Sequence, residues 1–208
     1  MSDRDAESGP PNEAAPRAAL TVTPPARIAL PSRFVLRAWT IADVGAFAEA
    51  LAASEAHLRP WTPWVIDGRV AGQTLEARVA QHARAFAEGT EWVYGLFAPD
   101  EATVAGGCGL YPRVGPKAIE IGYWLAAGQT GRGLATEATA ALTRVAFADP
   151  AIDEVQIRCE PRNVASARVP ERLGCHLVTA PDATAPVDAL RTLSVWRLSR
   201  AEHDAGPA

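Results

Sequence analysis

A strand, a glycine-rich turn and a helix follow one another in this chain and constrain its fold more than any other feature. Ile119–Leu125 is a short apolar and aromatic run of the kind found in strands. Gln129–Ala135 contains two glycines, which permit a tight backbone turn. From Leu134 onward apolar residues recur at helical spacing until Asp149, where the following proline ends the pattern. A helix that starts directly after such a turn presents free N–H groups and the positive end of its dipole, so the stretch predicts an anion site, typically for phosphate.

Two common phosphate motifs fit this turn poorly, and an ordinary strand-to-helix connection is an alternative reading. Thr136 stands where a dinucleotide-binding loop carries its third glycine. The Gly-Lys-Ser/Thr ending of a nucleoside-triphosphate loop is missing as well.

The turn sequence Thr130–Ala135, Thr-Gly-Arg-Gly-Leu-Ala, resembles the acyl-CoA loop of the GNAT superfamily of N-acetyltransferases, whose pattern is Arg/Gln-x-x-Gly-x-Gly/Ala. Thr130 stands where Arg or Gln is usual, and Gln129 lies one place earlier. Glu120–Leu125 and Ala135–Ala138 look like the RimJ/RimL-like branch, which acetylates the N-termini of ribosomal proteins. The resemblance implies that acetyl-CoA is the co-substrate and that main-chain N–H groups of the loop hold it.

The resemblance also implies which residues contact the cofactor. Amides near Leu125 and Ala126 are expected to pair with the pantetheine arm like an added strand and to polarise the thioester. The full expected set is Leu125, Ala126, Thr130, Gly131, Arg132, Gly133, Leu134, Ala135 and Asn163.

A second motif of the same family, Asn-x-x-Ser-x-x-Val…Leu-Gly, starts at Asn163 and ends at Gly174, with Cys175 replacing the usual aromatic residue. The resemblance implies that Ser166 lies near the CoA sulfur and protonates the departing thiolate. Pro170 has no N–H, so the helix is expected to be loosened beside this serine. A structural reading of the motif is the alternative, because Asn163 can cap the helix, Ser166 can fill its first turn and Gly174 can end it.

Glu120 is the candidate general base, since an amine must be neutral to attack a thioester. Regular alternation places Glu120, Gly122 and Trp124 on one face of the strand, and Gly122 leaves space between the two larger side chains. A surface carboxylate is the alternative reading. A bulge would reverse the parity of the strand, and a water relay is the other route for the proton.

Trp61 and Trp64 lie in a segment framed by prolines that looks like the acceptor-side segment of the RimJ/RimL-like branch. They are expected to bind the acceptor. Packing of both rings onto the core is the alternative.

The length, charge and composition of the chain restrict the class of protein it can be. Its 208 residues suffice for one well-buried domain, and the net charge of −4 argues against nucleic acid as a partner. No apolar run reaches the length of a membrane span, and the first residues do not resemble a secretory signal. Three isolated cysteines favour a reducing cytoplasm, and the four histidines show no ligand spacing, so no metal is expected.

The order of elements predicts a mixed α/β fold with a central, mostly antiparallel sheet and helices on both faces, which resembles the GNAT acetyltransferase fold. Residues 1–19 are expected to form a disordered tail and 20–33 an extended lead-in. The acetyltransferase domain is expected over 34–200, followed by a short C-terminal tail over 201–208.

These features together predict an acetyl-CoA-dependent N-acetyltransferase that works by direct attack of a primary amine, with a protein or peptide N-terminal α-amine as the favoured acceptor. One alternative is acetylation of a small amine such as an amino acid, polyamine or aminoglycoside. Another is a non-catalytic, regulatory acyl-CoA-binding module, against which the presence of both Glu120 and Ser166 argues. Family members occur as monomers and homodimers, and both states remain open.

Overall fold

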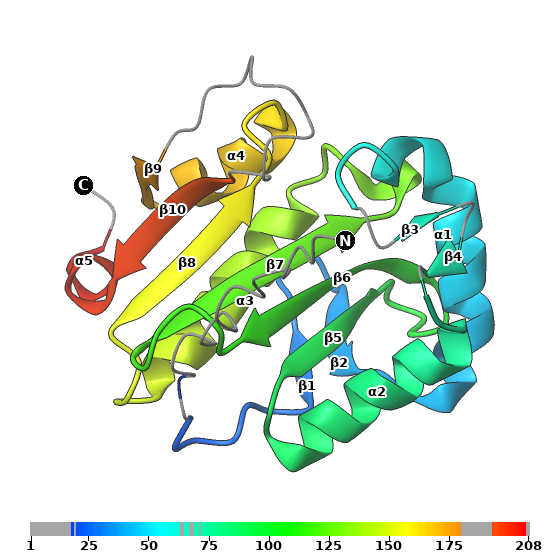
Figure 1. Ribbon diagram of the computed structural model, residues 1–208, viewed down its shortest axis with the longest axis horizontal. Helices are drawn as coiled ribbons and strands as arrows, with labels where there is room; N and C mark the ends of the chain where they lie inside the picture. The colour runs from blue at the N-terminus through cyan, green and yellow to red at the C-terminus, as the bar shows by residue number, and fades with distance from the viewer. Residues whose placement is uncertain are drawn as a thin grey trace, which may run out of the picture.

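The computed structural model describes residues 18, 20–62, 65–66, 69–70, 72–179 and 193–206 (Figure 1). The helices are α1 (Val44–Leu58), α2 (Leu75–Glu88), α3 (Leu134–Ala148), α4 (Val164–Arg172) and α5 (Arg200–Ala205), with short 3₁₀ turns at Ile41–Asp43 and Ala127–Gln129. The strands are β1 (Arg27–Ala29), β2 (Val35–Ala38), β3 (Val65–Ile66), β4 (Arg69–Val70), β5 (Trp92–Phe97), β6 (Val104–Tyr111), β7 (Ala118–Leu125), β8 (Glu154–Cys159), β9 (His176–Thr179) and β10 (Ser194–Ser199).

One sheet of eight strands organises the chain, in the order β1-β2-β5-β6-β7-β8-β10-β9. All its neighbouring pairs are antiparallel except β7 and β8, which run parallel because α3 crosses between them. The predicted mixed α/β fold with a mostly antiparallel sheet is confirmed.

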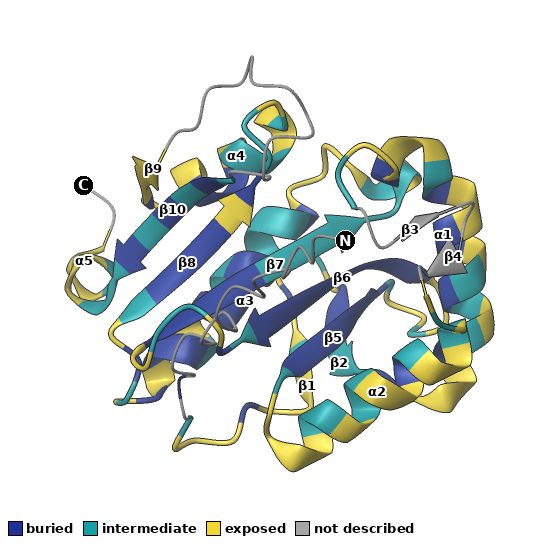
Figure 2. Cartoon of the chain, in the orientation of Figure 1, coloured by how far each residue is buried: buried dark blue, intermediate teal, exposed yellow. Residues whose placement is uncertain are grey.

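Two apolar clusters cover the two faces of the sheet. On one face Leu134, Ala138 and Leu142 of α3 pack against Ile119 and Ile121 of β7. On the other face α1 and α2 pack against β5 and β6, through residues that include Phe47, Leu51, Val79, Val93 and Phe97. Figure 2 shows the central strands as the most deeply buried part of the molecule, between these two helical layers.

The lead-in expected over 20–33 lies against the domain and contributes β1 to the edge of the sheet. Asp149, directly after α3, holds its beginning. The Asp149 carboxylate accepts hydrogen bonds from the main-chain N–H groups of Thr21 and Val22 and from the Thr21 hydroxyl, and Asp149 is only 1% exposed. Residues 1–17, most of the expected tail, lie outside the described part of the chain.

Two helices extend beyond their expected limits. Apolar residues at helical spacing, Val44, Phe47 and Leu51, indicate a helix here, and α1 continues past them to Leu58, close to the segment that holds Trp61. The C-terminal tail expected from residue 201 instead begins as α5. Ser199 and Glu202 form a reciprocal capping box at the start of α5. This pair is a local sequence signal for the beginning of a helix, in a segment with few apolar residues.

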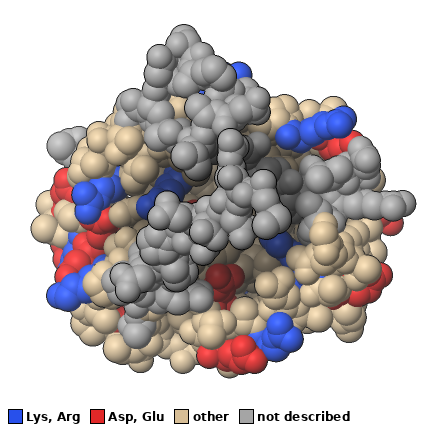
Figure 3. Space-filling view, in the orientation of Figure 1, with Lys and Arg blue, Asp and Glu red and all other residues tan. Residues whose placement is uncertain are grey.

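The described residues offer neither a membrane helix nor a metal cluster. None of the described helices is both long and apolar enough to cross a membrane. No group of three His, Cys, Asp or Glu side chains among the described residues is placed to hold a metal ion. On the face drawn in Figure 3, basic and acidic side chains of described residues are interspersed rather than segregated by sign.

Asp149 should be a measurable anchor for the N-terminal lead-in. Asp149→Asn places an amide NH₂ against N–H donors, so we expect the free energy of unfolding at pH 7 to fall by about 1–3 kcal/mol in urea denaturation. The control is Asp153→Asn, whose exposed carboxylate pairs with Lys117 and should contribute less than about 0.5 kcal/mol. Equal stability of Asp149→Asn and the wild type would mean that this carboxylate does not hold the segment.

The same anchor predicts a pH dependence. Burial acts to raise the pKa of Asp149, but hydrogen bonds from Val22, Ala151 and Thr21 outweigh burial and hold this pKa below its ordinary value. A folded-state pKa below the unfolded one gives stability that is present at neutral pH and is lost as the pH falls below about 4. The stability difference between wild type and Asp149→Asn should therefore shrink in acid.

Candidate functional site

The site begins where β7 and β8 part. Their parallel ladder ends at the pair Ile121 and Ile157, although β7 remains paired with β6 as far as Leu125. Burial changes at the same point, because the residues of β7 are buried through Ile121 and only half-buried beyond it. Among the described residues, no second strand pairs with the edge of β7 from Gly122 to Leu125 that lies opposite β6.

The open edge offers one of the two amides expected to bind the pantetheine arm. The N–H of Ala126 donates to the carbonyl of Ala105 at 2.9 Å and belongs to the β6 side. Successive N–H groups of a strand point in opposite directions. The N–H of Leu125 therefore points to the open edge. The expectation for Leu125 keeps its geometric basis, whereas the Ala126 N–H is already occupied.

The glycine turn delivers an uncapped helix end to this edge. Gly131 and Gly133 have positive φ values of 74° and 78°, which a glycine adopts without strain, and a Cβ on either would meet nothing within 4 Å. Gly133 is the N-cap of α3, and no side chain caps the helix there. The first three N–H groups of α3 have no partner within the helix, so they form a cradle for an anion.

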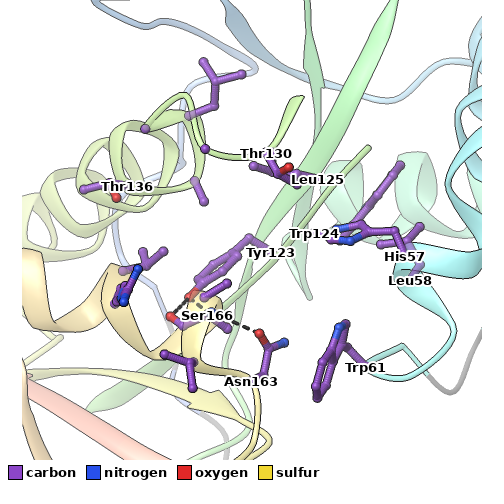
Figure 4. Close-up of a pocket in the computed structure, with 18 of the residues that line it drawn as sticks. His57, Leu58, Trp61, Tyr123, Trp124, Leu125, Thr130, Thr136, Asn163 and Ser166 are labelled. Atoms are coloured by element: carbon purple, nitrogen blue, oxygen red, sulfur yellow. Dashed lines mark hydrogen bonds between the residues drawn. The ribbon is translucent and has the colours of Figure 1, made fainter. Parts of the chain in front are cut away.

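A cavity of about 500 Å³ joins the open edge, the cradle and α4 (Figure 4). Its described lining contains three arginines, Arg162, Arg168 and Arg172, and no Asp or Glu, although the chain as a whole carries a net charge of −4. This excess of positive charge suits an anionic ligand. The described lining is His57, Leu58, Trp61, Thr62, Tyr123, Trp124, Leu125, Thr130, Gly131, Gly133, Leu134, Ala135, Thr136, Arg162, Asn163, Val164, Ala165, Ser166, Arg168, Val169 and Arg172.

Ser166 lies in the first turn of α4, facing the cavity. The Asn163 side chain caps this helix by accepting from the N–H of Ser166 at 3.1 Å, and Gly174 ends it with a φ of 76°, so the structural readings of both residues are confirmed. The Tyr123 hydroxyl lies 2.9 Å from the Ser166 carbonyl oxygen and 3.1 Å from its Oγ. Figure 4 shows the Tyr123 side chain pointing toward Ser166. Burial raises the pKa of Tyr123, so the phenol stays protonated.

Glu120 does not line the cavity. Glu120 is only 7% exposed. Its carboxylate accepts two hydrogen bonds from Arg113, at 2.7 and 3.1 Å, and lies 3.9 Å from the Arg158 guanidinium. The β6–β7 and β7–β8 registers run without a shift past Glu120, so the expected alternation with Gly122 and Trp124 holds and no bulge reverses it. Four residues of strand, about 13 Å, separate Glu120 from Trp124 at the cavity.

The other wall of the cavity comes from the end of α1 and the turn after it. His57, Leu58, Trp61 and Thr62 line it. Figure 4 shows the first three of these across the cavity from Ser166. Trp64, the other predicted acceptor residue, lies outside the described residues.

Most of the predicted cofactor residues line this one cavity, and two do not. Arg132 places its guanidinium 5.3 Å from the centre of the Phe34 ring and donates to Gln129, so its side chain points elsewhere. Ala126 is the second exception. Sequence reasoning missed Tyr123, Trp124 and His57. Only Tyr123 had a usable signal, since alternation places it on the face opposite Glu120, toward α3 and α4.

Residues 33–176 match the family model described as acetyltransferase (GNAT) domain, and the chain belongs to this family. It is 27% identical over 101 residues to the probable N-acetyltransferase YjcK of Bacillus subtilis (strain 168). That match spans 48% of this chain and 56% of YjcK, so it reaches little more than half the length of that relative.

Two solved structures show the same fold. RimL, a ribosomal alpha-N-protein acetyltransferase in complex with coenzyme A, superimposes with a TM-score of 0.70 at 20% identity, over 85% of this chain and 99% of that one. The microcin C7 self-immunity acetyltransferase MccE, in complex with acetyl-CoA and AMP, has a TM-score of 0.72 at 16% identity, over 87% of this chain and 98% of that one. At these identities the likeness concerns the fold alone.

The anion cradle can be tested with two substitutions of equal size at Gly131. Asp and Asn both tolerate a positive φ better than other residues, so strain is matched and only charge differs. We expect acetyl-CoA to raise the melting temperature of the wild type and, less strongly, of Gly131→Asn, while Gly131→Asp abolishes the shift. Equal shifts in the two variants would contradict phosphate binding at this turn.

Proposed function

We propose that this protein is an acetyl-CoA-dependent N-acetyltransferase. The observation that carries the proposal is the convergence on one cavity of an uncapped α3 end, the free edge of β7 and the Ser166 hydroxyl. The first of these suits the pyrophosphate, the second suits the pantetheine arm, and the third suits the sulfur. The complexes of RimL with coenzyme A and of MccE with acetyl-CoA support the same cofactor.

The reaction requires a neutral amine, a polarised thioester carbonyl and a proton for the leaving sulfur. The amine nitrogen attacks the acetyl carbon, the C–S bond breaks, and the thiolate takes the proton of Ser166, whose oxygen then recovers a proton from solvent water. Leu125 supplies an N–H at the open edge that can orient the acetylated arm. The amine gives up its own proton to a base.

Glu120 serves as that base through water in this proposal. It shares a strand face with Trp124, and that residue lines the acceptor side of the cavity. The separation of about 13 Å along the strand excludes direct transfer from an amine at the cavity, and Arg113 must share the carboxylate with the relay. His57 lines the cavity itself and is the competing base, since imidazole is the commonest general base of enzymes.

The proposed acceptor is a protein or peptide N-terminal α-amine. A free α-amine has a pKa of about 7.7–8.0, against about 10.4 for lysine, so a useful fraction is neutral near pH 7 without a strong base. A distant, arginine-paired carboxylate suits such an amine. The name of RimL supports this acceptor class, whereas the name of MccE shows that the fold also serves another purpose.

The two alternatives make different demands on the same cavity. A small-amine acetyltransferase needs a closed pocket for its acceptor, whereas a protein N-terminus needs room for the chain that follows it; Trp61 and Thr62, on the α1 wall of the cavity, would contact the acceptor in either case. A non-catalytic acyl-CoA-binding module needs no hydroxyl at the sulfur. The position of Ser166 beside Tyr123 therefore favours catalysis.

Ser166→Ala should lower kcat by roughly 10- to 1000-fold while acetyl-CoA still binds, because only the proton for the thiolate is removed. Ser166→Thr keeps the hydroxyl and should retain most of the turnover. Thiol release from acetyl-CoA measures the rate, and the acetyl-CoA melting shift measures binding. A kcat near that of the wild type in Ser166→Ala would leave this serine with no more than a helical role.

Peptides with a free, small N-terminal residue should be acetylated faster than the same peptides blocked at the N-terminus and carrying lysine. Trp61→Ala should raise the acceptor KM several-fold, roughly the loss of one aromatic wall, and leave acetyl-CoA affinity within about twofold. Trp61→Phe retains a ring and is the matched control. Faster acetylation of free polyamines or amino acids than of any peptide would move the assignment to the small-amine class. The same role predicted for Trp64 remains a prediction.

A further inference from the structure

A proline inside α4 leaves the Ser166 carbonyl without its ordinary helical partner. In an α-helix each carbonyl accepts from the N–H four residues later, which for Ser166 is residue 170. That residue is Pro170, which lies within α4 and is buried. Proline has no N–H, so the helix itself cannot supply this hydrogen bond.

Tyr123 supplies the missing donor from another element. Its phenolic oxygen lies 2.9 Å from the Ser166 carbonyl oxygen, 43 residues away in sequence. Tyr123 lies on β7 just past the end of the β7–β8 ladder, and its ring packs against the apolar cluster on the α3 face. The strand that provides the free edge for the cofactor thus also reaches α4.

A count of protons assigns the donor in the contact between the two hydroxyls, and Cys159 is a second side-chain hydrogen-bond partner of Ser166. The phenol has one proton, and a carbonyl can only accept, so the 2.9 Å contact uses the phenol's proton. The 3.1 Å contact between the two hydroxyl oxygens is then a hydrogen bond only if Ser166 Oγ–H donates to Tyr123 Oη. In this arrangement the serine proton is held on the cavity side of α4 and is not spent on a carbonyl of its own helix.

We propose that Tyr123 is a positioning residue for acetyl transfer: it donates to the Ser166 carbonyl that Pro170 leaves free, and thereby holds the Ser166 hydroxyl ready for the leaving sulfur. The inference rests on the proton-donor role proposed for Ser166. In the step itself the Ser166 O–H bond breaks, an S–H bond forms on coenzyme A, and the serine oxygen then takes a proton from solvent water. Tyr123 keeps its proton throughout.

The first measurement is the rate of Tyr123→Phe. We expect kcat to fall by about 3- to 15-fold, the effect of one misplaced hydrogen bond, with the acetyl-CoA KM within about twofold of the wild type. Tyr94→Phe is the matched control, because Tyr94 also donates a phenolic proton to a main-chain carbonyl at 2.9 Å, that of Pro25, and does not line the cavity. Its kcat should be unchanged. A kcat for Tyr123→Phe equal to that of the control overturns the proposal.

The second measurement restores the missing donor in another way. Pro170→Ala returns an N–H to residue 170, so the helix can satisfy the Ser166 carbonyl itself. The double variant Tyr123→Phe/Pro170→Ala should then recover to within about twofold of Pro170→Ala alone. The same fold-loss from Tyr123→Phe in both backgrounds would show that Tyr123 does not act through this carbonyl. If Tyr123→Phe folds only when Pro170→Ala is also present, the recovered stability supports the proposal. A double variant that fails to fold overturns the proposal.

The third measurement separates this inference from the proposed function. In a Ser166→Ala background, Tyr123→Phe should lower kcat by no further factor, because a positioning residue has nothing left to position. Independent, multiplying losses would overturn the role of Tyr123 and leave that of Ser166 intact. Ser166→Ala with the kcat of the wild type would instead refute the proton-donor role itself.

Discussion

The site depends on one structural constraint, the end of the parallel pairing between β7 and β8 at Ile121 and Ile157. Glycines on β6 hold the end of β7 on the other side. A Cβ at Gly106 would lie 2.3 Å from the Trp124 carbonyl oxygen, and one at Gly107 would lie 2.6 Å from the Trp124 indole nitrogen. Only a strand without side chains at these positions allows β7 to stay bonded to β6 to its last residue. On its other side, the edge of β7 that faces β8 is left open because the parallel pairing ends at Ile121.

The alternation of β7 assigns the two proposed proton transfers to different faces of the sheet. Tyr123 faces α3 and α4, where Ser166 lies, whereas Glu120 and Trp124 face the side of α1 and α2. In the proposed reaction the sulfur gains a proton on the first face and the amine loses one on the second.

Much of the fold and the geometry of the candidate cofactor site could be predicted from sequence because the relevant signals are local. Positive-φ glycines such as Gly131, a capping residue such as Asn163 and the alternation of β7 act over a few residues. The rest depends on partners far apart in the chain. The hydrogen bond between Ala126 and Ala105 and the pairing of Glu120 with Arg158 cannot be predicted from a short stretch of sequence, because the order of the strands in the sheet decides both. Pro170 was a local signal of a carbonyl in need of a donor, but only the fold could name Tyr123 as that donor.

The distribution of charge explains why the proposed base stands outside the cavity. The described lining holds three arginines and no carboxylate, as an anionic cofactor requires. A carboxylate within this lining would either repel the phosphates of the cofactor or form ion pairs with the arginines meant for them. Glu120 avoids both effects, because Arg113 and Arg158 stand beside it on the other face of the sheet. The distance that makes a water relay necessary for Glu120 thus follows from the charge that the cofactor brings.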